Sequence, residues 1–503
     1  MTVRPTSGYF KFAVLIVALG PILVGSKHGV GGEPIRAVSK ASCGSQDRTE
    51  SVSGETTLAE RFSSGPDKAY SCNLELIGQF QGEGAAADLE VLDDCAYYST
   101  APNPQMQHPG VAVLDVSDSR HPHATAYLDS VAMLAAHESL SIDRTRRLLL
   151  ASKLPDRFDI YDLSADCRYP ILKNSLSIPS LFSHIGAFTT DGRTYYGAKW
   201  PPDPKTPPAS AVFALDIRQP SNPHVLSTWI PPNMDWITHA VSVNKDGTRA
   251  YVALKRFDDD AAKASSPNGL VILDTSEIQA RRTNARIHLV STLFWDDTHE
   301  AEQVSAPVLI QGRPYLLFED GIGAIGFHVP PPAGVCDSGR PGHGFARIID
   351  IGDEKHPRTA SKLMLEVADP ANCSKVMYDP TLFGAYGSFA CSANYERDGK
   401  LVACAYFEGG LRVFDIRDPL HPKEVAYYKP PARRSESHPG SLFFTPTGPG
   451  TSPPDHTADS VITVPWFRNN GEEIWFTSED NGFQVVRFSD RFRTDHPELF
   501  PRP

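Results

Sequence analysis

The segment Gly410–Tyr428 reads GLRVFDIRDPLHPKEVAYY, and its pattern decides the fold. A short apolar run ends at Asp415, a polar turn closed by Pro follows, and a second apolar run comes after it. Related segments, each an apolar run ending in Asp, are VAVLDVSDSRHP from Val111, FDIYDLSADCRYP from Phe158, VFALDIRQPSNP from Val212, LVILDTSEI from Leu270 and ARIIDIGDEKHP from Ala346. A strand–turn unit that returns along a chain predicts a repeat architecture.

The spacing of the repeat selects one architecture. The shared aspartates are Asp115, Asp162, Asp216, Asp274, Asp350 and Asp415, at intervals of 47 to 76 residues. A four-stranded propeller blade needs about 40–50 residues, and longer intervals indicate loop insertions, whereas solenoid repeats of roughly 20–35 residues are too short. The sequence therefore predicts a β-propeller, a ring of four-stranded sheets around a channel.

Two segments that precede these units also resemble each other. SHIGAFTTDGRTYYGA from Ser183 and THAVSVNKDGTRAYVAL from Thr238 each contain two apolar runs joined by Asp-Gly. This is the strongest short-range signal of a β-hairpin. A blade is therefore expected to contain strands a and b joined by a tight turn, then a variable loop, the Asp-ending strand c, a polar turn and strand d.

The number of blades follows from where strand a begins. Six complete blades are expected from about Gly84, Glu138, His184, His239, Glu300 and Ser388. A seventh, from near Ser437, contains SLFFTP, EEIWFTS and GFQVVRFS but has no fourth strand. A spare strand, Asn73–Phe80, is expected to pair with Gly482–Phe488 and close the ring. We predict an all-β, seven-bladed propeller over residues 69–490, monomeric, with a C-terminal tail at 491–503.

The N-terminus carries a different pattern. Arg4 and Lys11 precede the apolar run FAVLIVALGPILVG at 12–25, which is shorter than the roughly 20 residues of a membrane span. Residues 1–30 are expected to be a secretory signal peptide, with an uncleaved anchor as the alternative. Residues 31–68 are polar and are expected to be a flexible segment. The mature chain is thus predicted to be extracytoplasmic, whether secreted, periplasmic or at the cell surface.

Export makes the eight cysteines interpretable, because an even number in an exported chain favours disulfides. Cys391 and Cys404 are expected on paired strands of one blade. Cys72 and Cys95 flank the closing strand, so a bond between them would join the seam of the ring. The other expected bond is Cys336–Cys373, which leaves Cys43 with Cys167.

The repeat resembles that of the LVIVD family, a group of extracytoplasmic β-propellers, and Gly410–Tyr428 is its most faithful copy. CNLELIGQF from Cys72, DCAYY from Asp94 and EDNGFQVVRF from Glu479 are also similar to exported bacterial members of this group. The resemblance spans residues 70–490. It implies the fold and an extracytoplasmic location but no reaction.

Candidate ligand residues gather at the predicted starts of strand a. They are His184, His239, His299 and His438, together with Glu138 and Glu300. Strand a lines the channel of a propeller, so side chains from different blades could converge there. Imidazoles with a carboxylate suit Zn, Cu or Fe. A structural polar ring and a small-ligand site are the alternatives.

Two functional hypotheses remain. The first is a binding or interaction scaffold that holds a protein or small ligand at the rims of the ring. The second is a metal-dependent enzyme with its site in the channel, similar in fold and channel histidines to the selenium-binding methanethiol oxidases. The net charge of −12 argues against nucleic acid as a partner. Beyond the N-terminal segment, no membrane contact is expected.

Overall fold

The structure is a computed structural model. It describes residues 36–61, 63–199, 210–233, 236–255, 268–304, 307–322, 335–373, 386–395, 397–433, 438–442 and 458–500. The predicted signal or anchor, residues 1–30, lies outside these ranges. Residues from Arg36 onward form one compact unit.

Seven small antiparallel sheets are arranged in a ring, and in the first five the main strands follow the chain from the innermost to the outermost strand. In the last two sheets the outermost strand comes from the N-terminal segment. Blade one contains β3 (Leu89–Leu92), β4 (Cys95–Ser99), β5 (Val111–Asp115) and β6 (His123–Leu128). Blade two contains β7 (Ser141–Asp143), β8 (Leu148–Lys153), β9 (Arg157–Asp162) and β10 (Ile171–Ser177). Blade three contains β11 (Gly186–Phe188), β12 (Thr194–Lys199), β13 (Ala211–Asp216) and β14 (His224–Trp229).

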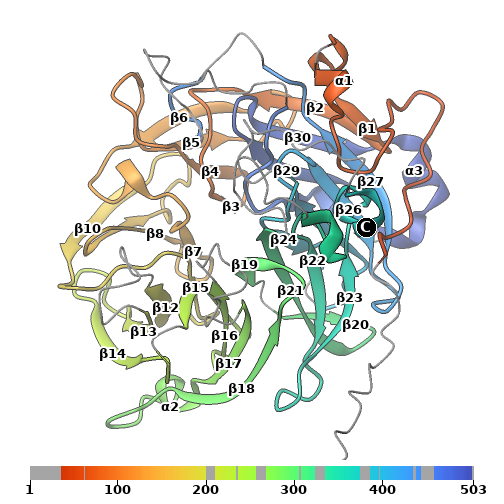
Figure 1. Ribbon diagram of the computed structural model, residues 1–503. Coiled ribbons are helices and arrows are strands. Elements are labelled where there is room, and N and C mark those ends of the chain that lie inside the picture. The colour runs from red at the N-terminus through yellow and green to blue at the C-terminus, as the bar shows by residue number, and fades with distance from the viewer. Residues whose placement is uncertain are drawn as a thin grey trace, which may run out of the picture. The chain divides into compact units, whose positions relative to one another are not determined.

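The remaining four blades complete the ring shown in Figure 1. Blade four contains β15 (Ile237–Val243), β16 (Arg249–Lys255), β17 (Asn268–Asp274) and β18 (His288–Trp295). Blade five contains β19 (His299–Val304), β21 (Arg313–Ile322), β22 (Ala346–Asp350) and β23 (Arg358–Leu363), with β20 (Val308–Ile310) paired to β21. Blade six contains β24 (Cys391–Ala393), β25 (Leu401–Ala405), β26 (Leu411–Asp415) and β27 (Lys423–Lys429), and blade seven contains β28 (Trp466–Arg468), β29 (Glu473–Ser478) and β30 (Gly482–Phe488). The predicted seven-bladed propeller is confirmed.

The N-terminal strand closes the ring as predicted. Strand β2 (Leu74–Phe80) pairs with β30, with Leu74 opposite Phe488 and Phe80 opposite Phe483. An unpredicted strand, β1 (Tyr70–Cys72), pairs with β27 on the outer edge of blade six. Asn73 turns the chain between the two strands with a φ of 59°, a left-handed conformation that asparagine tolerates better than most residues. Consecutive strands of one segment therefore cover two different blades.

The innermost strand of blade seven differs from the prediction. SLFFTP was expected to supply it, but Ser441 and Leu442 lie outside any strand and 443–446 lie outside the described residues. Strand β28 takes this position instead. It lies directly before the turn Asn469–Gly471, in which both asparagines have positive φ and lead straight into β29. Such a short turn fixes the hairpin register more tightly than a long connection can.

Helices are few and short in the described ranges. They are α1 (Leu58–Arg61), α2 (Ser276–Gln279) and α3 (Asp490–Asp495), with 3-10 turns at Gly65–Asp67, Met133–Ala135, Val335–Ser338, Glu366–Ala368, Pro370–Asn372, Asn469–Gly471 and Pro497–Leu499. None of the described helices has the length and apolar character that crossing a bilayer requires. The predicted C-terminal tail is not loose as far as residue 500, because Phe492, Leu499 and Phe500 are buried against blades six and seven.

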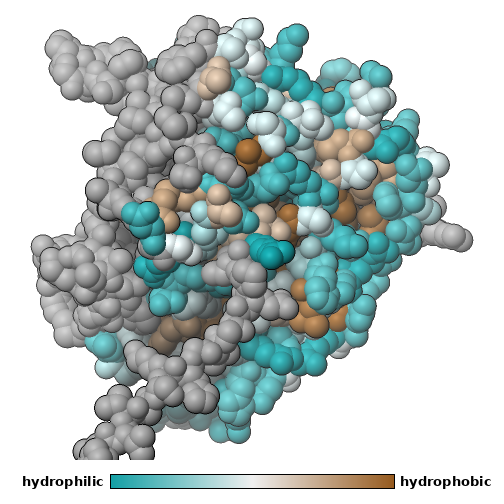
Figure 2. Space-filling model, turned by 45° about the vertical axis from the view of Figure 1, so that its right-hand side comes forward, coloured by the Kyte–Doolittle hydropathy of each residue, from teal (hydrophilic) through white to brown (hydrophobic). Residues whose placement is uncertain are grey.

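The core lies between neighbouring blades. One apolar cluster joins Tyr196 and Val212 of blade three to Val241 and Val252 of blade four. Each blade buries both faces in this way, so the strands b and c read as continuous apolar runs. Figure 2 shows one side of the surface, where hydrophilic residues predominate and apolar residues form separate patches.

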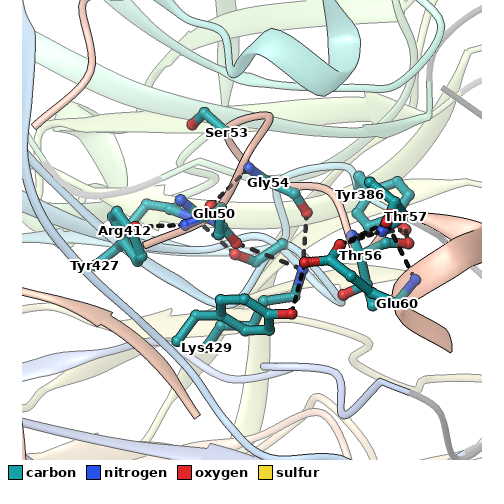
Figure 3. Close-up of polar contacts among 12 residues, drawn as sticks. Glu50, Ser53, Gly54, Thr56, Thr57, Glu60, Tyr386, Arg412, Tyr427 and Lys429 are labelled. Carbon is teal, nitrogen blue, oxygen red and sulfur yellow. Dashed lines mark hydrogen bonds and ion pairs between the residues drawn. The ribbon is translucent and has the colours of Figure 1, made fainter. Parts of the chain in front are cut away.

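Residues 36–69 form a packed segment, here named the N-terminal strap, where a flexible segment was expected. Glu50 lies between Arg412 and Lys429, with its carboxylate 2.7 and 2.9 Å from Arg412 Nη2 and 3.5 Å from Lys429 Nζ (Figure 3). All three side chains are at most 2% exposed. The polar composition was misleading because these charged groups satisfy one another inside the fold; residues 31–35 lie outside the described ranges.

Four disulfides join all eight cysteines. Cys336–Cys373 and Cys391–Cys404 are bonded as expected. The other two pairs are Cys43–Cys72 and Cys95–Cys167, so the expected Cys72–Cys95 and Cys43–Cys167 bonds are wrong. Cys72 lies opposite Tyr427 on blade six, and blade seven separates it from β4. The ordered strap brings Cys43 to Cys72, which the sequence did not indicate.

Candidate functional site

The antiparallel order of the strands gives the ring two different faces. We name the face with the a–b and c–d turns the turn face; 189–193 and 416–422 are examples. We name the opposite face, where each strand a begins, the entry face. It carries the b–c and d–a connections, such as 129–140 and 230–236.

The turn face is built from closed local hydrogen bonds. Every repeat aspartate accepts the backbone N–H of the residue two positions later, at 2.8–3.0 Å; these are Asp115, Asp162, Asp216, Asp274, Asp350 and Asp415. Such Asx turns are a standard way to leave a strand. In the same turns His121, His356 and His421 each lie 2.8–2.9 Å from an aspartate three positions earlier. These repeated residues therefore have a structural role.

The entry face brings three of the predicted residues together at the channel. His184 Nε2 lies 2.9 Å from His239 Nε2 and 3.4 Å from Glu138 Oε2. The three residues come from blades two, three and four, at or just before β7, β11 and β15. They are 8% exposed or less. We name these three and His137 the channel-mouth cluster.

His137 is the residue that sequence reasoning missed. Its Nε2 lies 3.1 Å from Glu138 Oε1, and its ring centroid is 5.6 Å from that of His184. Successive side chains of a strand point to opposite faces, so only one of two neighbours was expected to face the channel. The φ of 51° at His137 breaks this alternation. The adjacent pair His137-Glu138 was the only available signal in the sequence.

A second irregularity places His239. The pairing of β15 with β16 shifts register between Thr238 and Ala240, so His239 is the extra residue of a β-bulge. Bulges re-aim side chains and are common next to functional sites. Both positions with irregular backbone thus direct imidazoles into the same cluster.

Burial and neighbouring charges shift the pKa values of the groups in the cluster. Burial, together with the nearby Lys255 and His137, lowers the pKa of His184, although the Glu138 carboxylate opposes this shift. Burial acts to raise the pKa of Glu138, but His184 and His137 outweigh it and hold that pKa well below its ordinary value. The arrangement therefore favours a neutral His184 beside an ionised Glu138 near neutral pH.

Other predicted site residues lie elsewhere or cannot be placed. His438 lies on the connection from blade six to blade seven, and its Nε2 is 3.0 Å from Nε2 of Gln81, which directly follows β2. Its grouping with His184 stays a prediction. The backbone of His299 pairs with Ile322 in blade five. The side chains of His299 and Glu300 lie outside what the structure describes.

The residues with described side chains contain two groups whose potential metal-ligand atoms lie within 4.8 Å of one another. One is His137, Glu138 and His184. The other is Cys43, Asp47 and Cys72, in which the two cysteines form a disulfide. A thiolate ligand is therefore not available there, and the channel-mouth cluster is the stronger candidate.

A small cavity lies at the turn-face end of the same three inner strands. Its volume is about 270 Å³, and its lining includes Ile142, Phe188, Ser242 and Val243. Burial raises the pKa of Asp143, which also lines it. The inner strands of blades two to four thus carry polar groups at both ends.

No family model and no curated protein matches the chain. Among the solved structures that match is one titled "Structure of U3-55K", at 9% sequence identity and a TM-score of 0.49. The match covers 82% of this chain and 98% of that chain. The function must therefore be argued from the site.

Proposed function

We propose that this chain is an exported β-propeller of the LVIVD type that binds a ligand or partner through its entry face. Four disulfides support an oxidising, extracytoplasmic location, since such bonds are rare in reducing compartments. The short apolar run at 12–25 supports export.

One observation favours the entry face over the turn face as the binding surface. The repeat residues of the turn face pair within their own turns, whereas the entry face gathers histidines and a glutamate from separate blades. The entry face also carries the connections on either side of blade six, whose described parts are 364–373, 386–390, 430–433, 438–442 and 458–465. Long connections on a rigid scaffold are where binding residues concentrate.

Export can be tested with a fusion. Residues 1–35 are joined to a reporter enzyme that is active only outside the cytoplasm, beside a fusion in which 12–25 are deleted. We expect reporter activity from the first fusion only. Activity from neither fusion would contradict export by this segment.

The face can be tested by photo-crosslinking in the native cell envelope. A benzophenone amino acid replaces Val131 or Ile230, which are 43% and 64% exposed on the entry face, or Leu420, which is 58% exposed on the turn face. We expect discrete adducts from Val131 and Ile230 and none from Leu420. Adducts from Leu420 alone, or from no position, would contradict the proposal.

Catalysis at the channel mouth is the second candidate. Glu138 favours it, because a buried carboxylate among imidazoles can move a proton for a bound substrate. A screen of hydrolytic and redox model substrates tests this candidate. Turnover that is lost in Glu138→Gln, with the crosslinking pattern retained, would support an enzyme; no turnover in the metal-loaded protein would favour the binding function alone.

A further inference from the structure

We infer that the channel-mouth cluster binds a single divalent first-row transition-metal ion through His137, Glu138, His184 and His239. This inference rests on the proposed function, which places the binding site on the entry face. It names a metal ion as the ligand. The residues come from three blades, so no short sequence motif marks the site.

The distances between the donor atoms fit a small cation. Nitrogen and oxygen ligands lie about 2.0–2.1 Å from zinc, which places the donors of a tetrahedral site roughly 3.3 Å apart. The observed separations are 2.9 Å between the two Nε2 atoms, 3.4 Å from His184 to Glu138 and 3.1 Å from His137 to Glu138. The ligand atoms of His137, Glu138 and His184 all lie within 4.8 Å of one another, and His239 adjoins this group through His184.

Glu138 provides an independent observation. Glu138 is 8% exposed, and its Oε2 atom is buried without a hydrogen-bond partner. This oxygen is the one that lies 3.4 Å from His184 Nε2. A buried carboxylate oxygen without a hydrogen bond costs free energy, and a bound cation would remove that cost.

The surrounding contacts hold the ligands in place. Asp88 Oδ2 accepts the backbone N–H of Leu140 at 2.6 Å, which fixes the segment that carries His137 and Glu138. Ser139 Oγ donates to the carbonyl oxygen of Ser152, also in blade two. The backbone N–H of His184 donates to Ala198 O. Outer contacts of this kind orient ligands and raise metal affinity.

The donor set narrows the class of metal. Imidazole nitrogens suit Zn, Cu, Fe and Ni, and hard ions such as Ca²⁺ prefer oxygen-only sites. The buried Lys255 adds a positive charge near His184, which disfavours a cation. The ionised Glu138 opposes that charge. The His137 side chain is 44% exposed, which gives the ion a route from solvent.

The test uses the mature, disulfide-bonded chain freed of metal with a chelator. It is titrated with Zn²⁺ and with Co²⁺, whose visible absorption reports tetrahedral nitrogen and oxygen ligands, and bound metal is counted after dialysis. We expect one equivalent per chain. In Glu138→Gln and His239→Asn the affinity should fall at least about tenfold, as for loss of ligand contacts.

A matched control is His343→Asn. His343 is buried like His239, and the Nε2 atom of His343 has no hydrogen-bond partner. It precedes β22 in blade five. This variant should bind metal as the parent does. Glu138→Gln preserves the side-chain shape and keeps the test decisive if a histidine variant fails to fold.

Two outcomes would overturn the inference. One is the absence of stoichiometric Zn²⁺, Cu²⁺, Co²⁺, Ni²⁺ or anaerobic Fe²⁺ binding; the other is equal affinity in parent and Glu138→Gln. Either result together with entry-face adducts would leave the binding proposal intact. Stoichiometric metal with adducts only from Leu420 would instead support the metal site and reject the proposed binding face.

Discussion

Glu50 in the N-terminal strap and Glu138 at the channel mouth are both buried carboxylates whose pKa is lowered, yet their surroundings differ. Burial acts to raise the pKa of Glu50, but the charges of Arg412 and Lys429 hold it down. Glu50 also accepts the backbone N–H of Gly54 at 3.0 Å. Glu138 lies beside the imidazoles of His137 and His184, interacts electrostatically with the buried Asp88 carboxyl, and keeps one oxygen without a hydrogen bond.

The difference in partners distinguishes a carboxylate with a structural role from one that can take part in a functional site. The Glu50 carboxylate has fixed partners that the chain itself supplies, so nothing further is needed to satisfy it. The partners of Glu138 can change protonation state and can bind metals. A lowered pKa alone would not distinguish the two residues, whereas the chemistry of the partners does.

The largest effect is expected from Arg412→Met. Arg412 Nη1 also lies 3.1 Å from Oε1 of the buried Glu424. The change removes the Arg412 charge from both carboxylates, so the unfolding free energy should fall by about 3–5 kcal/mol. Chemical denaturation measures the change. Arg417→Met is the control, because Arg417 is 42% exposed on the turn face. Equal losses in the two variants would contradict the structural role given to the Glu50 cluster.

Metal binding is expected to have a smaller effect on the free energy of unfolding. Zn²⁺ at 100 times its dissociation constant should raise the unfolding free energy by about 2.7 kcal/mol. Glu138→Gln should reduce this increase to about 1.4 kcal/mol or less, as expected for an affinity loss of tenfold or more. It should change the stability of the metal-free protein little, since an ionised group with poor partners is removed. Thermal unfolding with and without Zn²⁺ measures both. A large loss of metal-free stability would mean that Glu138 resembles Glu50.

The pH dependence should distinguish the two regions next. The pKa of His184 is lowered, so its contribution is complete above about 6.5 and is lost as pH falls toward the folded value. The pKa of Glu50 is also lowered, so its contribution is lost only as pH falls below the ordinary glutamate range. Between pH 7 and pH 5, stability should therefore decline through His184 and not through Glu50.

Stability curves of variants test this assignment. His184→Asn should flatten the decline between pH 7 and 5, and Glu50→Gln should leave its slope unchanged. His343 contributes to the same decline, because burial lowers its pKa to about 4, so His343→Asn is measured in parallel. An unchanged slope in His184→Asn would reject the assignment.

The smallest effect is expected on the turn face. His421 and Asp418 are 78% and 61% exposed, and an exposed pair contributes little to stability. His421→Ala should leave the melting temperature and the metal affinity unchanged. A loss of metal binding in this variant would remove the distinction between the two faces.

The repeat allowed prediction of what lies within a blade. The Asp-ending strands, the Asp-Gly hairpins and the closing strand Asn73–Phe80 all follow from local alternation and spacing. The Cys391–Cys404 bond was also predictable, since its two strands are adjacent in one hairpin.

Features that depend on several blades were harder to predict. His137 and His239 reach the cluster through a positive φ and a β-bulge, which apolar spacing does not reveal. The Cys43–Cys72 bond depends on a strap whose order comes from buried charges, which its polar composition concealed.

The short reach from β1 to β2 has a mechanical consequence. The Cys43–Cys72 bond closes a covalent loop around residues 44–71, next to the two strands that pair with blades six and seven. Tension on the chain ahead of Cys43 would pass through this bond directly to Asn73 and β2. Residues 44–71 would carry no load, and the seam between blades six and seven would be pulled through β1 and β2.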